Sequence, residues 1–177
     1  MRTVPLIRKC DSKDETRILY IINKAAKIYK GAIPEERYHE PYMPIEELRR
    51  EMGKMTFYGY EDGGQLIGVM GFQPFREVAL IRHAYVLPEH QRRGVGGKLL
   101  KYLRQRTSNP TLLVGTWKNA EWAIRFYEKH GFRLLQNKEE LLRKYWDISQ
   151  CQVETSVVLG IDLTLSRRQA LLKNTRP

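Results

Sequence analysis

Apolar residues recur along this chain with two different periods, and these periods predict where helices and strands lie. The segment from Thr3 to Cys10 has the pattern of a strand, and Ser12–Glu15 then has the form of a capping box at a helix N-terminus. Apolar residues follow at helical spacing, and Gly31 predicts the end of that helix. The positions that form its apolar face are Ile18, Ile22, Ala25, Ala26 and Tyr29.

Prolines divide the next part of the chain into a loop and a short helix. Pro34, Pro41 and Pro44 fall within residues 31–44, so we expect an ordered loop there rather than a regular element. Pro44 suits the first position of a short helix, because its missing N–H would have no partner in the first turn. We expect Ile45, Leu48 and Met52 of this helix to face the core, and the helix to end at Gly53.

The middle of the chain has the pattern of strands joined by tight turns. Residues 57–60 and 66–72 lie on either side of Asp62-Gly63-Gly64, which is typical of a β-hairpin. A further strand is predicted over residues 78–86, and a helix is predicted after the glycine-rich segment that follows it. The inner face of that helix is Val95, Leu99 and Leu103, and its outer face is Lys98, Lys101 and Arg104.

The last part of the chain predicts two more helices among three strands. Residues 112–116 form a short apolar run typical of a buried strand, and a helix is predicted from Asn119 to Gly131. Residues 132–136 and 152–159 are predicted to pair as the last two strands. A short amphipathic helix over residues 138–146 is predicted between them.

Length and composition describe one globular domain. The 177 residues are 42% hydrophobic and 29% charged, and the predicted element order is β-α-α-β-β-β-α-β-α-β-β, an α/β fold with a mixed central sheet. We expect a single domain over residues 1–165 and a basic, mobile tail over residues 166–177. No apolar run approaches the roughly 20 residues that a membrane span requires. The N-terminus also lacks the apolar core of a signal peptide, so we expect a cytoplasmic protein with no membrane partner.

Charge and cysteine content change this picture little. A net charge of +11 attracts phosphates, including those of nucleic acid. The basic residues are spread along the chain, however, and no nucleic-acid-reading motif is present, so nucleic acid is not the favoured partner. Cys10 and Cys151 lie far apart and have no metal or redox spacing. We interpret both as structural thiols and predict no metal site.

The segment from Val86 to Leu100 carries the clearest chemical signal. A strand-like run ends at Pro88, three closely spaced glycines follow, and an amphipathic run then begins. The N–H groups of a first helical turn lack partners, and the helix dipole adds positive charge there, so such a turn attracts anions. Glycines let a phosphate approach these N–H groups closely. We therefore expect a phosphorylated cofactor at this loop.

Two familiar phosphate-binding motifs are excluded. A Walker A loop needs Ser or Thr after its Gly-Lys pair, but Gly97-Lys98 is followed by Leu99. A dinucleotide fingerprint needs a third glycine in register after Gly94-Val95-Gly96, and it belongs directly after the first strand of a βαβ unit. Neither condition is met.

The segment instead resembles the acetyl-CoA signature of the GCN5-related N-acetyltransferase (GNAT) superfamily, Q/R-x-x-G-x-G/A. Gln91-Arg92-Arg93-Gly94-Val95-Gly96 matches its fixed positions, and the preceding strand ends in Val86-Leu87-Pro88, the V-x-P ending that the family shows. Farther along, Asn119 to Phe132 is similar to the second cofactor segment of the family. Less sharply, the resemblance extends over most of residues 3–160.

The resemblance implies a fold and a cofactor. The expected fold is a mixed sheet of about seven strands with four main helices, in which two strands splay apart where acetyl-CoA binds. Backbone groups of Tyr85, Val86 and Leu87 would hold the pantetheine arm, and an N–H near Val86 would polarise the thioester carbonyl. The residues that would receive the pyrophosphate are Gln91, Arg92, Arg93, Gly94, Val95, Gly96, Gly97 and Lys98.

Asn119 and Tyr127 each have a cofactor interpretation and a structural one. Asn119 begins the second motif, where the matching family residue commonly meets the pantetheine arm, but asparagine is also a preferred N-cap. Tyr127 lies where the family often places its general acid, and a phenol is suited to protonating a leaving thiolate. Its alternative role is that of a core aromatic beside Ile124 and Phe126.

The general base is less well marked. Many family members carry a glutamate on the strand equivalent to residues 78–86, but this strand holds none and Glu77 lies just before it. We predict His83 as the base, because a neutral imidazole accepts a proton near neutral pH. Strand alternation would place His83 and Tyr85 on one face, and Arg82, Ala84 and Val86 on the other. The alternatives are a half-buried sheet residue at His83, Glu77 as the base, or a chain of water molecules.

The acceptor is predicted to be a small-molecule amine or a peptide amino group. In the resembled fold it is bounded by residues 31–44 and about 138–150, and the alternative for the first segment is a solvated loop with packed tyrosines. The acidic and aromatic residues that would suit a cationic amine there are Glu35, Glu36, Tyr38, His39, Glu40 and Tyr42. Neither cysteine lies in a nucleophile motif, so we expect direct transfer without an acyl-enzyme.

Three rival functions and the oligomeric state stay open. One rival transfers a longer acyl group, a second is a non-catalytic CoA-sensing module, and the third binds nucleic acid. Because many family members are dimers, the resemblance also leaves a homodimer open.

Overall fold

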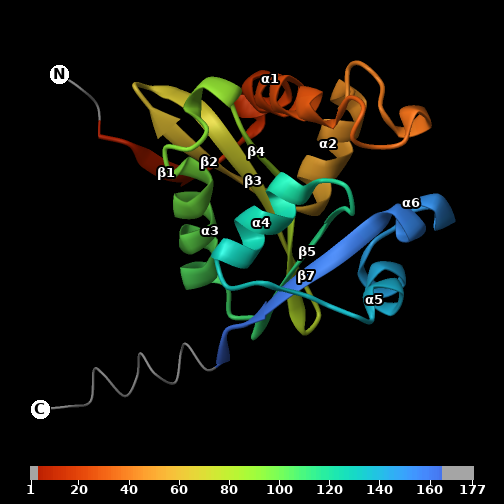
Figure 1. The fold of residues 1–177 in the computed structure, drawn as a ribbon. Coiled ribbons are helices and arrows are strands. Elements are labelled where there is room, and N and C mark those ends of the chain that lie inside the picture. Colours follow the sequence, from red (N-terminus) through yellow and green to blue (C-terminus); the bar gives the residue numbers. More distant parts are fainter. Residues whose placement is uncertain (1–3, 165–177) are drawn as a thin grey trace, which may run out of the picture. The chain divides into compact units, whose positions relative to one another are not determined.

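The computed structural model describes residues 4–164 (Figure 1). The chain divides into two compact units, of which the first comprises residues 1–73 and 81–105 and the second comprises residues 74–80 and 106–177. The basic tail predicted over residues 166–177 lies outside the described residues.

The strands form a seven-stranded sheet in the order β1-β2-β3-β4-β5-β7-β6. Their bounds are β1 (Leu6–Lys9), β2 (Thr56–Asp62), β3 (Gln65–Phe75), β4 (Val78–Val86), β5 (Thr111–Trp117), β6 (Arg133–Leu134) and β7 (Ser156–Asp162). β1 pairs antiparallel with β2, and β2 with β3, while β7 pairs antiparallel with both β5 and β6. The predicted α/β fold with a mixed sheet of seven strands is therefore confirmed.

Six α-helices and four 3-10 turns lie among the described residues. They are η1 (Ser12–Asp14), α1 (Glu15–Ala25), η2 (Ala26–Tyr29), η3 (Glu35–Arg37), α2 (Ile45–Lys54), η4 (Pro88–His90), α3 (Val95–Arg106), α4 (Glu121–Lys129), α5 (Lys138–Tyr145) and α6 (Gln150–Thr155). The helix predicted from the capping box to Gly31 corresponds to α1 with η2, and the helix predicted from Pro44 to Gly53 corresponds to α2. The helices predicted after the glycine-rich segment, from Asn119 to Gly131 and over residues 138–146 correspond to α3, α4 and α5. Only α6 was not predicted.

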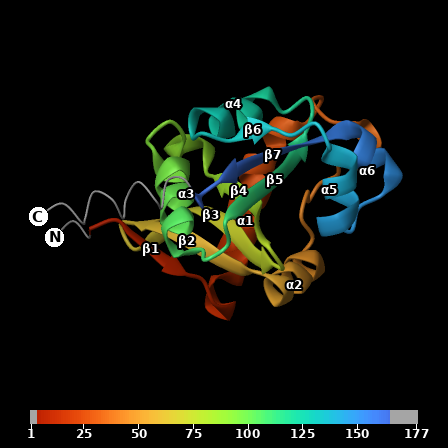
Figure 2. The same cartoon turned by 90° about the horizontal axis from the view of Figure 1, so that it is seen from below.

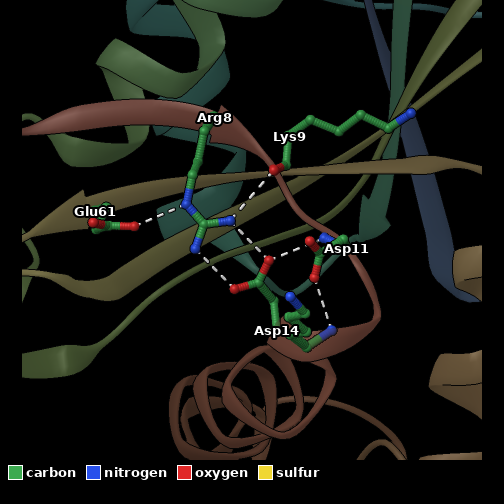
Figure 3. Close-up of polar contacts among 6 residues, drawn as sticks. Arg8, Lys9, Asp11, Asp14 and Glu61 are labelled. Carbon is green, nitrogen blue, oxygen red and sulfur yellow. Dashed lines mark hydrogen bonds and ion pairs between the residues drawn. The ribbon is translucent and has the colours of Figure 1, made fainter.

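Arg8 joins three elements of the first unit, as Figure 3 shows. Its guanidinium donates to both carboxylate oxygens of Asp14 at 2.8 Å each, and its Nε donates to Glu61 of β2 at 2.8 Å. Asp14 also accepts the Asp11 N–H at 2.9 Å, so the capping box begins at Asp11 rather than at Ser12 as predicted. The box lies one residue earlier because Arg8 holds the Asp14 carboxylate at the start of the turn.

The two faces of the first unit's strands carry different helices. A Cβ added to Gly68 of β3 would lie 2.9 Å from Val95 Cγ1 of α3 and 3.2 Å from Val86 Cγ2, so Val86 points toward α3. Tyr85 points to the opposite face, where its ring meets that of Tyr29, in the connection between α1 and α2, at 6.4 Å. In Figure 1, α3 and the pair α1 and α2 can be followed on either side of these strands.

In the second unit, α5 and α6 lie side by side next to β7 (Figure 2). The predicted strand over residues 152–159 is wrong in its first half, because α6 continues to Thr155 and β7 begins at Ser156. Ser149 and Gln152 form a capping box, with Gln152 N–H to Ser149 Oγ at 3.3 Å and Ser149 N–H to Gln152 Oε1 at 3.1 Å. Lys138 Nζ donates to carbonyl oxygens at the other end of α6, including Ser156 at 2.8 Å.

The second unit has its own apolar core. β6 is only two residues long but pairs with β7 as predicted, at Arg133 opposite Gly160 and Leu134 opposite Leu159. Burial of each large core side chain contributes roughly 1.5–3 kcal/mol. The buried residues of this core are Val78, Leu80, Leu113, Leu142, Tyr145, Val153 and Val158.

Candidate functional site

The glycine loop is tied to the end of β4 in the first unit. The Gln91 side chain turns back, and its Nε2 donates to the Val86 carbonyl oxygen at 3.0 Å. Both backbone polar groups of Leu87 are used within the protein, since its N–H donates to Ile67 of β3 at 2.9 Å and its carbonyl accepts the His90 N–H at 2.8 Å. Leu87 therefore has less to offer a cofactor than the prediction assumed.

The backbone of the loop opens toward solvent before α3 begins. Arg92 and Gly94 have positive φ angles of 60° and 79°, and nothing lies within 4 Å of a Cβ added to Gly94. The Lys98 N–H donates to the Gly94 carbonyl at 2.9 Å, which is the first turn of the helix. The N–H groups of Val95, Gly96 and Gly97 come before this first bond, so no carbonyl within the helix accepts from them. This geometry fits an anion such as a pyrophosphate.

Basic side chains add positive charge around this opening. Arg92 and Arg93 are exposed. The Lys98 ammonium donates to the Tyr60 hydroxyl of β2 at 3.2 Å and lies 5.4 Å from the centre of that ring. Because Val95 is buried against Gly68, the start of α3 is fixed close to β3.

Tyr85 belongs to a cluster of phenols on the other face of β4. Its hydroxyl hydrogen-bonds with Tyr29 and Tyr42, and the Tyr29 and Tyr42 rings lie 5.3 Å apart. Burial raises the pKa of Tyr85 well above its ordinary value, so this phenol stays neutral. The cluster attaches the loop over residues 31–44 to the strand that precedes the glycine loop.

The loop over residues 31–44 is ordered, as predicted. Asn23 of α1 holds its end, since Asn23 Nδ2 donates to the Met43 carbonyl at 2.9 Å and Asn23 Oδ1 accepts the Met43 N–H at 2.7 Å. The Tyr38 hydroxyl donates to Glu40 at 3.0 Å, and the His39 ring stacks on Tyr42 at 6.3 Å. The predicted acidic and aromatic residues therefore gather on one anchored segment.

His83 interrupts the regular alternation of β4. Its φ of 49° is unusual for a residue with a side chain, and it lets two consecutive side chains reach the same carboxylate. His83 Nε2 lies 2.8 Å from Glu51 Oε2, and an Arg82 guanidinium nitrogen lies 3.2 Å from the same oxygen. The prediction that alternation separates Arg82 from His83 is therefore wrong.

Glu51 of α2 is a site residue that the sequence analysis missed. The residue is only 7% exposed, although the helix pattern predicted Met52 as the inward residue. Burial alone would raise the pKa of Glu51, but the hydrogen bond from His83 and the charge of Arg82 outweigh burial and hold the pKa at about 2. Glu51 lies three positions after the inward Leu48, and residues three apart share a helix face, so this spacing could have indicated that Glu51 is buried.

The second unit holds Tyr127 and Asn119. Tyr127 of α4 is 4% exposed, with its ring 5.0 Å from Phe126 and 5.4 Å from Phe132. Asn119 is exposed in a turn before α4, and the N-cap is Ala120. The N-cap interpretation of Asn119 is wrong, because the Ala120 N–H donates to Trp117 and adds a turn before the helix begins.

Glu77 takes part in a clasp at the turn between β3 and β4. Its Oε1 accepts from Lys144 Nζ at 2.7 Å and from the Tyr145 hydroxyl. These donors lower the pKa of Glu77 to about 2. Such a weakly basic carboxylate accepts a proton poorly at neutral pH, so the contacts favour a structural role for Glu77.

Residues 4–164 hold neither a membrane-spanning helix nor a cluster of metal ligands. No helix there is long and apolar enough to cross a membrane. No group of three or more His, Cys, Asp or Glu side chains in that range is placed to hold a metal ion.

Comparison with known proteins places these observations in a family context. The family model described as an acetyltransferase (GNAT) domain matches residues 53–134, from the end of α2 through β6. The peptidyl-lysine N-acetyltransferase YiaC of Escherichia coli is 30% identical over 98 residues, which are 54% of this chain and 64% of YiaC. The uncharacterized N-acetyltransferase YjcF of Bacillus subtilis is 32% identical over 98 residues, which are 55% of this chain and 67% of YjcF. The match thus spans slightly less than two thirds of YiaC.

The fold is also similar to that of solved structures. The PaiA N-acetyltransferase of Thermoplasma acidophilum, solved in complex with coenzyme A, superposes with a TM-score of 0.69. The superposition covers 90% of this chain and 99% of that protein at 18% identity. At this identity the likeness concerns the fold.

Proposed function

This chain belongs to the GNAT acetyltransferase family, and we propose that it transfers an acetyl group from acetyl-CoA directly to a primary amine. One observation carries the proposal: the signature loop is open and tied back to β4 through Gln91 and the Val86 carbonyl. The first-turn N–H groups of α3 at Val95 to Gly97 lie next in sequence to the exposed Arg92 and Arg93, which together favour a bound anion. The residues present therefore fit a phosphorylated cofactor.

The chain offers separate groups to separate parts of acetyl-CoA. The N–H groups from Arg92 to Gly97 would receive the pyrophosphate, assisted by the α3 dipole, whereas the predicted Lys98 N–H is already used by the Gly94 carbonyl. Successive N–H groups of a strand point to opposite edges, and the Leu87 N–H points toward β3. The Val86 N–H therefore points away from β3, which suits it to polarise the thioester carbonyl. When bound, acetyl-CoA supplies an acyl carbon open to attack by an amine.

Two side chains are proposed for the proton transfers. His83 accepts the proton that the attacking amine loses, directly or through water, and Tyr127 donates a proton to the departing thiolate. Cys10 is not suited to act as an acyl carrier, because burial raises the pKa of its thiol to about 12. Direct transfer to the amine is thus the proposed route.

The proposed acceptor is a small amine or the amino group of a peptide. The anchored loop over residues 31–44 presents exposed carboxylates at Glu35, Glu36 and Glu40, which attract an ammonium. The relative YiaC is named for peptidyl-lysine, which supports testing peptides. The net charge of +11 disfavours a strongly basic tail as the acceptor.

Calorimetric titration with acetyl-CoA, desulpho-CoA and ATP tests the cofactor, and release of CoA thiol with a panel of amines and lysine peptides tests the reaction. We expect micromolar binding that requires the CoA moiety, and thiol release that depends on the amine. Folded protein that binds no acetyl-CoA would overturn the proposal. Binding without turnover across the whole panel would favour the non-catalytic, CoA-sensing alternative.

A further inference from the structure

A buried carboxylate of α2 contacts the imidazole of β4 in the first unit. Glu51 Oε2 lies 2.8 Å from His83 Nε2, and Glu51 is one of few charged residues buried among those described. Burying a carboxylate is costly, and a packed apolar side chain at this helix position would avoid that cost. The carboxylate therefore calls for an explanation beyond packing.

The surroundings of the pair fix its charge. From β4, Arg82 reaches Glu51 Oε2 at 3.2 Å, and from α2 itself, Lys54 Nζ reaches Glu51 Oε1 at 3.3 Å. Arg82 is also held by Gln73 Oε1 of β3 at 3.3 Å, and the His83 ring stacks on Phe57 of β2 at 5.9 Å. Glu51 thus stays ionised next to His83.

An ionised carboxylate can only accept hydrogen bonds, so it fixes the tautomer of its partner. His83 Nε2 must carry the proton that Glu51 accepts, which leaves the lone pair on Nδ1. Among residues 4–164, the hydrogen bond of the His83 ring is made by Nε2 with Glu51. Stacking on Phe57 and the positive φ of His83 hold the ring in one orientation.

We propose that Glu51 is a positioning residue, which keeps His83 in the Nε2–H tautomer so that Nδ1 accepts the proton of the acceptor amine. This inference rests on the proposed acetyl transfer. In the step, an N–H bond of the amine breaks and a bond between Nδ1 and hydrogen forms. The positive charge that appears on the ring lies next to the Glu51 carboxylate, which stabilises it.

Glu51→Gln removes the charge and keeps a similar shape, so it separates positioning from packing. We expect kcat to fall by roughly 10²-fold, while the affinity for acetyl-CoA and the acceptor KM change by less than about 3-fold. The pH–rate profile should differ from that of wild type, because the carboxylate that contacts the proposed base has lost its charge. Glu51→Asp, which keeps the charge, should recover part of kcat.

Glu61→Gln is the matched control. Glu61 is a partly buried carboxylate of the same unit that bonds Arg8 instead of His83, so its loss should leave kcat and the pH profile unchanged. Melting temperatures of all variants check the fold. Equal pH profiles for wild type and a folded Glu51→Gln variant would overturn the inference.

Nitrogen-15 spectra of the histidine rings in the wild-type protein test the inference without any variant or turnover. We expect the neutral His83 ring to carry its proton at Nε2 and none at Nδ1. A ring protonated at Nδ1 would overturn the positioning role even if acetyl transfer is found. Absence of acetyl transfer, with the expected tautomer present, would instead count against the proposed function.

Discussion

Gln91 donates a hydrogen bond from Nε2 to the carbonyl oxygen of Val86 at 3.0 Å, so the first residue of the glycine signature is tied to the last residue of β4. This contact explains in physical terms why that position needs a long side chain with a donor. The hydrogen bond links the end of β4 to the anion-binding turn. The Val86 N–H and the N–H groups of the loop are thereby kept at a fixed spacing.

Replacing Gln91 by alanine should weaken cofactor binding. The substitution removes one hydrogen bond of about 0.5–1.5 kcal/mol, so we expect the Kd for acetyl-CoA to rise by roughly 2-fold to 12-fold. Calorimetric titration measures the change. Gln105→Ala, at an exposed position of α3, should bind acetyl-CoA like wild type. Equal affinities for Gln91→Ala and wild type would show that the loop needs no tie to β4.

Gly94→Ala and Gly63→Ala form a matched pair that separates backbone strain from cofactor contact. Both glycines have positive φ, 79° and 59°, and neither has an atom within 4 Å of an added Cβ. We expect each variant to lose about 1–2 kcal/mol of stability in urea denaturation. Only Gly94→Ala should also weaken acetyl-CoA binding, by more than about 10-fold, because its methyl group faces the anion site. Comparable binding by both variants would contradict this role of Gly94.

Features that depend on nearby residues could be predicted from the sequence. The hairpin at Gly63-Gly64 needs two consecutive positive φ angles, which glycine adopts freely, and both are present. The glycine loop was found in the same way, because turn and helix start follow one another within ten residues. Even the capping box was found to within one residue.

Features that depend on distant residues could not be predicted. Glu51 and His83 are 32 positions apart, and no local pattern specifies which helix residue meets which strand residue. The helix pattern favoured the apolar Met52 over Glu51 as the inward residue, because Arg82 and His83, which contact Glu51 Oε2, belong to β4 and lie about thirty positions away. The helix α6 was missed although Ser149 and Gln152 carry the capping-box pattern.

Tyr127→Phe should separate catalysis from packing in α4. The phenylalanine keeps the ring contacts with Phe126 and Phe132, so we expect little change in the Kd for acetyl-CoA. The loss of a proton donor should lower kcat by roughly 10²-fold. Tyr145→Phe, which removes the hydroxyl that bonds Glu77, should lower stability and spare kcat. If both variants keep wild-type kcat, Tyr127 is a core aromatic only.

The two thiols should differ in reactivity. Cys10 is 6% exposed and its pKa is raised to about 12, whereas Cys151 on α6 is half-buried. We expect a thiol reagent to label Cys151 first in native protein near about pH 8, and Cys10 only after unfolding. Mass spectrometry of the labelled peptides identifies the site. Rapid labelling of Cys10 in folded protein would reopen the question of an acyl-enzyme.

Glu51 should make the protein sensitive to acid. Its pKa falls from an ordinary 4.5 to about 2 on folding, so between these values the unfolded chain takes up a proton that the folded chain does not. Stability gained from Glu51 is therefore fully present above about pH 4.5 and is lost as the pH falls toward 2.

The difference in unfolding free energy between wild type and Glu51→Gln should be largest near neutral pH and should shrink with acidification. Urea denaturation of both proteins at about pH 6, 4 and 3 measures it, and carboxylates common to both cancel in the difference. A difference that stays constant across this range would mean that the charge of Glu51 does not stabilise the fold, and that its contacts with His83 and Arg82 act by shape alone.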